Sequence, residues 1–300
     1  MPFRVTDSLM SARLIEQLAT ARQRQAKAQE QIASGKRINR PSDDPVGAEK
    51  VMNIRVSQAA LEQFKKTVTQ ADEKLRVGDN ALESYEQLLD RAGALLAQGL
   101  SDFTTQDARQ SLAVEIDGLR ERALSIAQMK HGDEYLFGGT RQDQPPFDST
   151  GAPAPTPSSE QLLQIEPDAP PVITGVRAED VFSDGSGSIF DLLSAAATAL
   201  RGTGDPVADR ATLENAMGRL KALTSQVQAS RTRLGVAMER VESVGSRLDA
   251  DNLSLETIAQ QFESADFAEA AVRFTEASNL IEAITQSARL NRNSIVDILG

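Results

Sequence analysis

The stretch LEQFKKTVTQADEKLRVGDNALESYEQLLDRAGALL, residues 61–96, decides the fold class, because its apolar positions step alternately by three and four residues. The series comprises Leu61, Phe64, Val68, Ala71, Leu75, Gly78, Leu82, Tyr85, Leu89, Ala92 and Leu96. A hydrophobic repeat of about 3.5 residues keeps one seam of a helix facing a partner helix. The stretch therefore predicts a long helix, which begins where Asp44 can cap it and Pro45 can take the first helical position.

A second seam with the same alternation runs from Leu213 to Phe262 and supplies a partner for the first. A shorter apolar face lies between them, from Leu112 to Ile126, and its helix is expected to end at His131-Gly132. A cationic His131 at that end would complement the helix dipole. Three helices with matched seams can bury one another. The sequence thus predicts a mainly α fold, an elongated rod of long antiparallel, coiled-coil-like helices.

Residues 134–188 interrupt this pattern. Eight of the twelve prolines fall between Pro145 and Pro171, and proline breaks the interior of a helix. Short β-prone runs surround them, at 134–137, 161–166 and 171–176. We expect a small, loop-rich β insertion that is not a free-standing domain, followed by a short helix over 189–200.

The two ends of the chain carry narrow apolar seams of their own. The N-terminal seam stops near Gly35, and the C-terminal one restarts after a loss of phase at 263–266, where Asp266 and Glu269 form a capping box. Helices with so narrow a stripe are marginal alone in water, so we expect them to need partner helices. The candidate assembly residues on these seams are Leu14, Leu18, Ile32, Phe267, Phe274, Ile281, Ile284, Ile295 and Ile298.

These breaks predict three parts in the chain. Residues 1–40 with 263–300 would form an inner coiled-coil domain from the terminal helices. Residues 41–133 with 189–262 would form the central helical rod, and 134–188 would form an outer β insertion.

Composition excludes several classes of function. With no Cys and one His, the chain has no disulfides, no thiol nucleophile, no Cys-ligated zinc and no two-His zinc motif. Its 32 basic and 43 acidic residues give a net charge of −11, which argues against nucleic-acid binding. Ten Phe, two Tyr and no Trp are too few for a bulky globular core. We find no run of about 18 apolar residues for a membrane span, and no apolar segment of a cleaved signal in residues 1–25.

Two motifs superficially suggest chemistry. Asp43 and Asp44 could be an acid/base pair or a calcium anchor, but flanking prolines before a helix favour capping roles for both. Gly138-Gly139 lacks the Gly-Lys-Ser/Thr core of a phosphate loop. The sequence therefore predicts no enzyme, with no catalytic, cofactor-binding or metal-binding residues, and a mechanical or scaffolding role.

Several local motifs resemble the flagellin family. They are QIASGKRIN at residues 31–39, the linker motif Pro41, Ser42, Asp43, Asp44 and Pro45, YLFGGT at 135–140, ESADFAEA at 263–270 and NSIVDIL at 293–299. The likeness covers both termini and both long helices and leaves residues 141–205 unaccounted for. Within the family, the PSDDP form and the SIVDIL ending are more similar to the members that join hook and filament than to flagellins.

The resemblance implies a structural adaptor of the bacterial flagellum that joins hook and filament by helix-mediated polymerisation. Its implied partners are the preceding junction protein of the hook, flagellin, and further copies of itself in a ring. It also implies secretion to the flagellum by the type III pathway, without a cleaved signal and with a cytosolic chaperone on the C-terminal helix. An atypical flagellin is one alternative. A cytosolic coiled-coil scaffold is another, but it gives no reason for the helix breaks near both ends.

Overall fold

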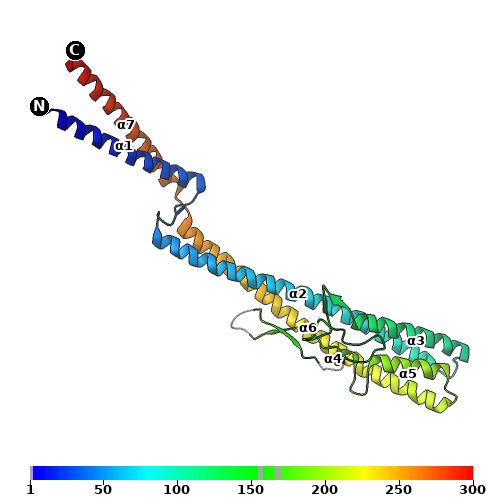
Figure 1. Ribbon diagram of the computed structural model, residues 1–300. Helices are drawn as coiled ribbons and strands as arrows, with labels where there is room; N and C mark the ends of the chain where they lie inside the picture. The colour runs from blue at the N-terminus through cyan, green and yellow to red at the C-terminus, as the bar shows by residue number, and fades with distance from the viewer. Residues whose placement is uncertain (1–2, 155–157, 166–169, 300) are drawn as a thin grey trace. The chain divides into compact units, whose positions relative to one another are not determined.

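The computed structural model describes residues 3–154, 158–165 and 170–299, and within these ranges the side chains from 12 to 289. The helices are α1 (Phe3–Ser34), α2 (Pro45–Gly99), α3 (Gln106–Ala127), α4 (Ala178–Phe182), α5 (Ile189–Arg201), α6 (Pro206–Glu263) and α7 (Phe267–Leu299). The strands are β1 (Lys130–His131), β2 (Glu134–Tyr135), β3 (Gln161–Leu163) and β4 (Val172–Gly175). Figure 1 shows this arrangement, and the predicted mainly α fold class is confirmed. Among the described residues, no helix has the length and apolarity that crossing a membrane requires.

The chain divides into two compact units, a smaller one of residues 1–61 and 250–300 and a larger one of residues 62–249. The boundaries fall inside α2 and α6, whereas the predicted domain limits fall near the breaks between helices. The three-part division expected from the sequence stays a prediction.

In the larger unit, α2 packs against α6 along the predicted seams. Every seam residue of α2 from Val68 to Leu96 is buried except Gly78, and every seam residue of α6 from Leu213 to Leu248 is buried. Polar contacts flank the seams in reversed order along the chain, which shows that the helices run antiparallel. Lys65 Nζ lies 2.6 Å from Asp249 Oδ1, and Arg231 pairs with Asp79 at 3.0 Å and with Glu86 at 2.9 Å. The carboxylates of Asp79 and Glu86 raise the pKa of Arg231, so its guanidinium stays charged.

Helix α3 ends earlier than expected, and the predicted role of His131 is wrong. The last residue of the helix is Ala127, and the chain then enters a hairpin in which Lys130 pairs with Tyr135. Gly132 adopts a left-handed φ of +61°, but in the hairpin turn and not after the helix. His131 lies in β1, away from the end of α3. Strand pairing and the Lys130 ammonium, 4.4 Å from the Tyr135 ring centroid, stabilise the hairpin where the sequence suggested another helical turn.

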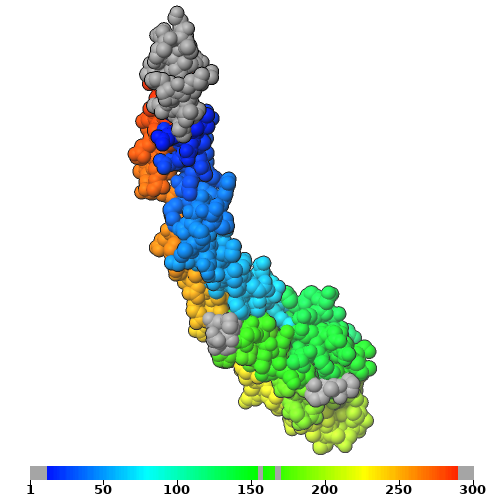
Figure 2. Space-filling model, turned by 60° about the vertical axis from the view of Figure 1, so that its left-hand side comes forward, coloured from blue at the N-terminus to red at the C-terminus, as the bar shows by residue number. Residues whose placement is uncertain are grey.

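The insertion shares a core with the helices of the larger unit. It contains short antiparallel pairings, β1–β2 and β3–β4, and also helix α4, which the proline pattern did not predict. Five aromatic rings gather where it meets α2 and α5, namely Tyr85, Phe137, Phe147, Phe182 and Phe190. Each ring is at most 2% exposed, and centroids lie as close as 4.5 Å. In the space-filling view the insertion and α3, in green, form one continuous mass (Figure 2).

The composition argument gave no indication of this local cluster of five rings. Tyr85 and Phe182 are adjacent in space but far apart in sequence, and Phe147 lies edge-on to Phe190. Concentrating five rings at one place yields a compact core that no average over the chain reveals. The predicted helix after the insertion is confirmed as α5.

Gly78 tests the α2–α6 register. A Cβ at this position would lie 3.6 Å from Leu234 Cδ1, so the seam has room for that atom but not for a whole leucine side chain. We predict that Gly78→Leu lowers the free energy of unfolding by about 1–3 kcal/mol through overpacking, measured by chemical denaturation with circular dichroism. A Cβ at Gly93, on the same helix, meets no heavy atom within 4 Å. Gly93→Leu should leave stability unchanged or raise it. Equal stability of the two variants would show that this register is wrong.

Candidate assembly interface

In the smaller unit, the first and last helices of the chain, α1 and α7, pack as an antiparallel pair (Figure 1). Gln25 Nε2 donates a hydrogen bond to Ser278 Oγ at 2.9 Å across the pair. The residues buried between the helices include alanines at a spacing of seven, Ala21 and Ala28 on α1 and Ala270 and Ala277 on α7. Small side chains at a contact allow two helix backbones to approach closely. The pair is therefore held by a narrow alanine seam.

This seam accounts for only part of the predicted interface. Ile284 is buried in the pair, Leu14, Leu18, Ile32, Phe274 and Ile281 are half-buried, and Phe267 is 66% exposed. Ile295 and Ile298 belong to α7, but their side chains lie outside the described residues. Sequence reasoning missed Ile15, Val272 and Leu280, which are exposed and lie off the seam. The paired helices thus leave a second set of apolar side chains facing water.

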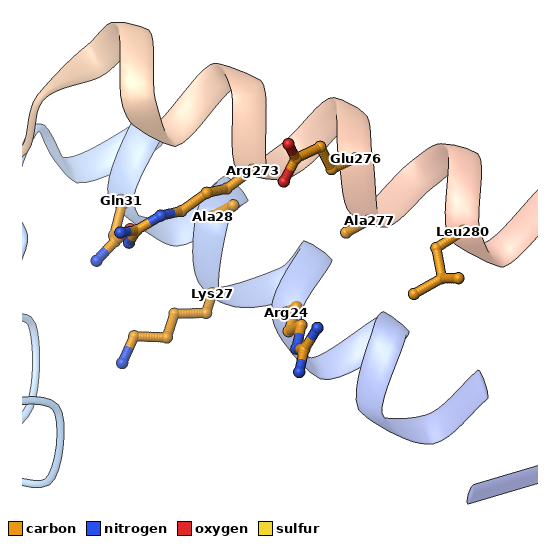
Figure 3. Close-up of a pocket in the computed structure, with 8 residues that line it drawn as sticks. All are labelled: Arg24, Lys27, Ala28, Gln31, Arg273, Glu276, Ala277 and Leu280. Atoms are coloured by element: carbon orange, nitrogen blue, oxygen red, sulfur yellow. The ribbon is translucent and has the colours of Figure 1, made fainter. Parts of the chain in front are cut away.

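A groove of about 630 Å³ runs between α1 and α7 (Figure 3). Ala28, Ala277 and Leu280 supply its apolar lining. Its polar lining comes from Arg24, Lys27, Gln31, Arg273 and Glu276, three cations against one carboxylate. Apolar lining with basic edges suits an amphipathic partner that carries negative charge.

The two helix breaks of the smaller unit are joined by backbone hydrogen bonds. Lys36 forms an antiparallel bridge with Ser264, Arg37 N donates to the Glu263 carbonyl at 2.6 Å, and Ala265 N donates to the Gly35 carbonyl at 3.0 Å. Gly35 has a φ of +67°, which lets the chain turn out of α1. The linker between α1 and α2 is thereby fixed to the linker between α6 and α7.

Glu263, the last residue of α6, strengthens this joint. Its carboxylate pairs with Lys36 at 2.9 Å and with Arg55 of α2. Burial disfavours the charged carboxylate, but Lys36 and Arg55 outweigh it and hold the pKa of Glu263 below its ordinary value. The sequence offered no signal for this role, because the partners are far apart along the chain.

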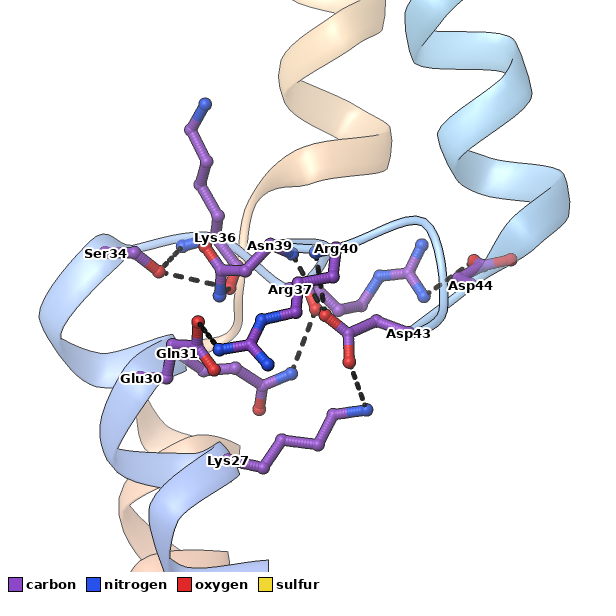
Figure 4. A network of polar contacts seen from close by, with 10 residues as sticks. All are labelled: Lys27, Glu30, Gln31, Ser34, Lys36, Arg37, Asn39, Arg40, Asp43 and Asp44. Carbon is purple, nitrogen blue, oxygen red and sulfur yellow. Dashed lines mark hydrogen bonds and ion pairs between the residues drawn. The ribbon is translucent and has the colours of Figure 1, made fainter.

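The PSDDP motif supplies the other half of the joint (Figure 4). Asp44 is the N-cap of α2, since its Oδ1 accepts a hydrogen bond from Gly47 N at 2.9 Å, and Pro45 is the first helical residue. Asp43 does not cap the helix as expected. Its Oδ2 accepts from the backbone N–H groups of Asn39 at 3.2 Å and Arg40 at 3.0 Å. Pro41 and Ser42 lie in the exposed turn that these bonds close.

Charge and close packing fix these roles. Lys27 of α1 lies 2.9 Å from Asp43, and together with the Arg40 amide it lowers the pKa of that carboxyl. The Gly47 amide and Arg37 lower the pKa of Asp44. A Cβ at Gly47 would come within 2.6 Å of the Asp44 carboxylate and of Ile38 Cδ1, so a larger residue there would displace these side chains. At the other break, Asp266 caps α7 through Ala268 N at 2.9 Å, while Glu269 pairs with Arg273.

The lowered pKa values predict how the joint responds to acid. Because Asp43 and Asp44 titrate below their ordinary value of 3.8, their charged forms stabilise the fold above that pH, and this stabilisation is lost as pH falls through the folded-state values. Hydrogen exchange of the Asn39, Arg40 and Gly47 amides, corrected for intrinsic rates, should therefore accelerate below about pH 4.

The control is the cap of α3, where Ala108 N donates to the neutral hydroxyl of Thr105 at 3.3 Å. This hydroxyl does not titrate, so protection of Ala108 should be steady over the same pH range. Equal acceleration at both caps would contradict a carboxylate origin of the joint.

Comparisons with known proteins agree with this geometry. The bacterial flagellin N-terminal helical region matches residues 5–142, and the bacterial flagellin C-terminal helical region matches residues 217–299. Flagellar hook-associated protein 3 of Escherichia coli (strain K12) is 27% identical over 236 residues, covering 72% of this chain and 74% of the relative. The flagellin of Bacillus subtilis (strain 168) is 24% identical over 309 residues, covering 97% of this chain and 96% of the relative.

Solved structures share the fold at lower sequence identity. A putative flagellar hook-associated protein from Vibrio parahaemolyticus aligns with a TM-score of 0.68 and 15% identity, over 74% of this chain and 100% of that chain. The flagellar junction protein FlgL from Legionella pneumophila aligns with a TM-score of 0.58 and 13% identity, over 72% of this chain and 100% of that chain. With both helical regions matched and the fold shared, the chain belongs to the flagellin family.

Proposed function

We propose that this protein is a structural adaptor that joins the hook to the filament of the bacterial flagellum. One observation carries the proposal. The terminal helices pair through alanines, yet they leave Ile15, Phe267, Val272 and Leu280 exposed, and Leu280 lines a groove with basic edges. Burying an apolar side chain of this size contributes about 1.5–3 kcal/mol, so packing against neighbouring subunits stabilises an assembly.

The names of the relatives support the junction over the filament, with flagellin as the second candidate. Hook-associated protein 3 and flagellin both match the chain. The PSDDP linker and the SIVDIL ending resemble the junction members more than flagellins. The partners are then the preceding hook-associated protein, flagellin and further copies of this chain in a ring. Export by the flagellar type III pathway, with a chaperone on the C-terminal helix, brings the protein outside the cell.

The adaptor performs no chemistry in this proposal. The polar clusters at Asp43, Asp44 and Glu263 are engaged in caps and ion pairs that hold the joint. Their role is to set the geometry of the terminal helices. A cytosolic coiled-coil scaffold would have no need for such a joint near both ends.

Location separates these functions directly. Immunogold labelling of sheared flagella should place the protein at the boundary between hook and filament. Label along the whole filament would favour a flagellin, and label confined to the cytosol would favour a scaffold.

A pair of matched substitutions on α7 tests the role of the terminal helices. Ile284 is 7% exposed in the α1–α7 pair, whereas the neighbouring Thr285 is exposed and its hydroxyl donates to the Ile281 carbonyl of its own helix. We predict that Ile284→Asp abolishes incorporation into flagella and swimming, because it places a charge in an apolar contact. Thr285→Asp should retain both. Normal swimming of an Ile284→Asp strain, with the protein present at the junction, would contradict the proposal.

A further inference from the structure

One end of the larger unit presents two isolated apolar side chains to water. Phe103, in the turn between α2 and α3, is 96% exposed, and Val207, in the first turn of α6, is 79% exposed. Among the described residues no large apolar side chain is more exposed than these two. An ion pair between Asp102 and Arg210, at 2.9 Å, holds the two turns together. We call Phe103, Val207 and this ion pair the tip.

The tip is a fixed structure. Thr104 Oγ1 donates to the Gln98 carbonyl at 2.6 Å, and Thr104 N donates to the Ser101 carbonyl at 3.1 Å. Gln106 Nε2 donates to the Arg201 carbonyl at 2.8 Å, which ties α3 to the end of α5. Phe103 is thus held out in water by an ordered turn, a costly arrangement unless another surface covers the ring.

The turns that carry the tip, residues 101–107 and 203–210, are negatively charged. They contain four Asp and one basic residue, Arg210, and three of these Asp, at 102, 107 and 205, are exposed. A partner surface therefore needs an apolar recess for a benzyl ring and positive charge at its edge.

A groove of about 410 Å³ in the smaller unit has both features. Ile38, Pro41, Ala48 and Met52 give it apolar walls, and Met52 is 64% exposed. Its other lining residues are Lys36, Asn39, Arg40, Arg55 and Glu263, three cations against one carboxylate. The volume accommodates a phenylalanine side chain, and guanidinium or ammonium groups over an aromatic face add cation–π attraction.

We propose that the tip of one copy inserts Phe103 into this linker groove of a second copy. Residues of the first turns of α2 line the groove, and Phe103 follows the last turn of this 55-residue helix. The contact joins two different surfaces and so builds rings or open chains of subunits. This contact rests on the proposed function, because that function requires self-association. It also specifies which two surfaces of the protein meet.

Disulfide trapping tests the contact without interference, because the chain contains no Cys. Full-length Phe103→Cys and Met52→Cys proteins are mixed at concentrations where light scattering shows self-association, and then oxidised. The mixture should give a disulfide-linked dimer, and the double variant should give a ladder of oligomers. Val236→Cys is the control, since Val236 is 63% exposed on α6. Mixed with Met52→Cys it should give no dimer.

A second variant measures the contribution of the ring. Because Phe103 is exposed, Phe103→Ala should fold normally and weaken self-association about tenfold. Self-association without the Phe103–Met52 disulfide would overturn this contact and leave the adaptor proposal standing. A disulfide formed within one chain, or formed equally by Val236→Cys, would also overturn it. Failure of the unmodified protein to self-associate would overturn this contact, whereas the adaptor proposal is overturned by immunogold label away from the boundary between hook and filament.

Discussion

The antiparallel packing of α2 on α6 is the constraint on which the rest of the structure depends. It is built from apolar positions at strict alternation of three and four residues, which keep one seam buried from Val68 to Leu96 and from Leu213 to Leu248. Only short linkers separate α2 from α1 and α6 from α7. The alanine seam holds α1 against α7. The contacts of Glu263, Asp43 and Asp44 hold the two linkers from which these helices extend.

Much of this fold follows from local sequence rules. The hydrophobic period alone predicts the long helices. Local residue patterns also predict the N-cap at Asp44, the end of α1 near Gly35 and the break before Phe267. The end of α3 was missed because Lys130 and Tyr135 pair as strands, a contact that competes with another helical turn. The helix or strand preference of single residues does not show whether a short hairpin or a further helical turn is more stable.

The remaining errors concern contacts between distant residues. The five-ring cluster joins Tyr85 to rings up to Phe190, and composition averages over the chain cannot locate it. The Glu263 ion pairs reach Lys36 and Arg55 across the chain. At the candidate interface, the predicted assembly residues were the large side chains of the terminal seams, whereas the residues buried between α1 and α7 are largely the alanines of the same seams. Small residues at seven-residue spacing were the available signal for that seam, and their close approach explains why larger side chains are left outside.

We expect the terminal helices to have their full set of contacts only in the assembled flagellum. Hydrogen exchange tests it most directly, by comparing the amides of residues 12–34 and 267–289 in the isolated protein and in purified hook–filament preparations. Protection should rise strongly in both helices on assembly, with little change along the buried seam of residues 68–96. Unchanged protection in both terminal helices, or a gain confined to the larger unit, would contradict it.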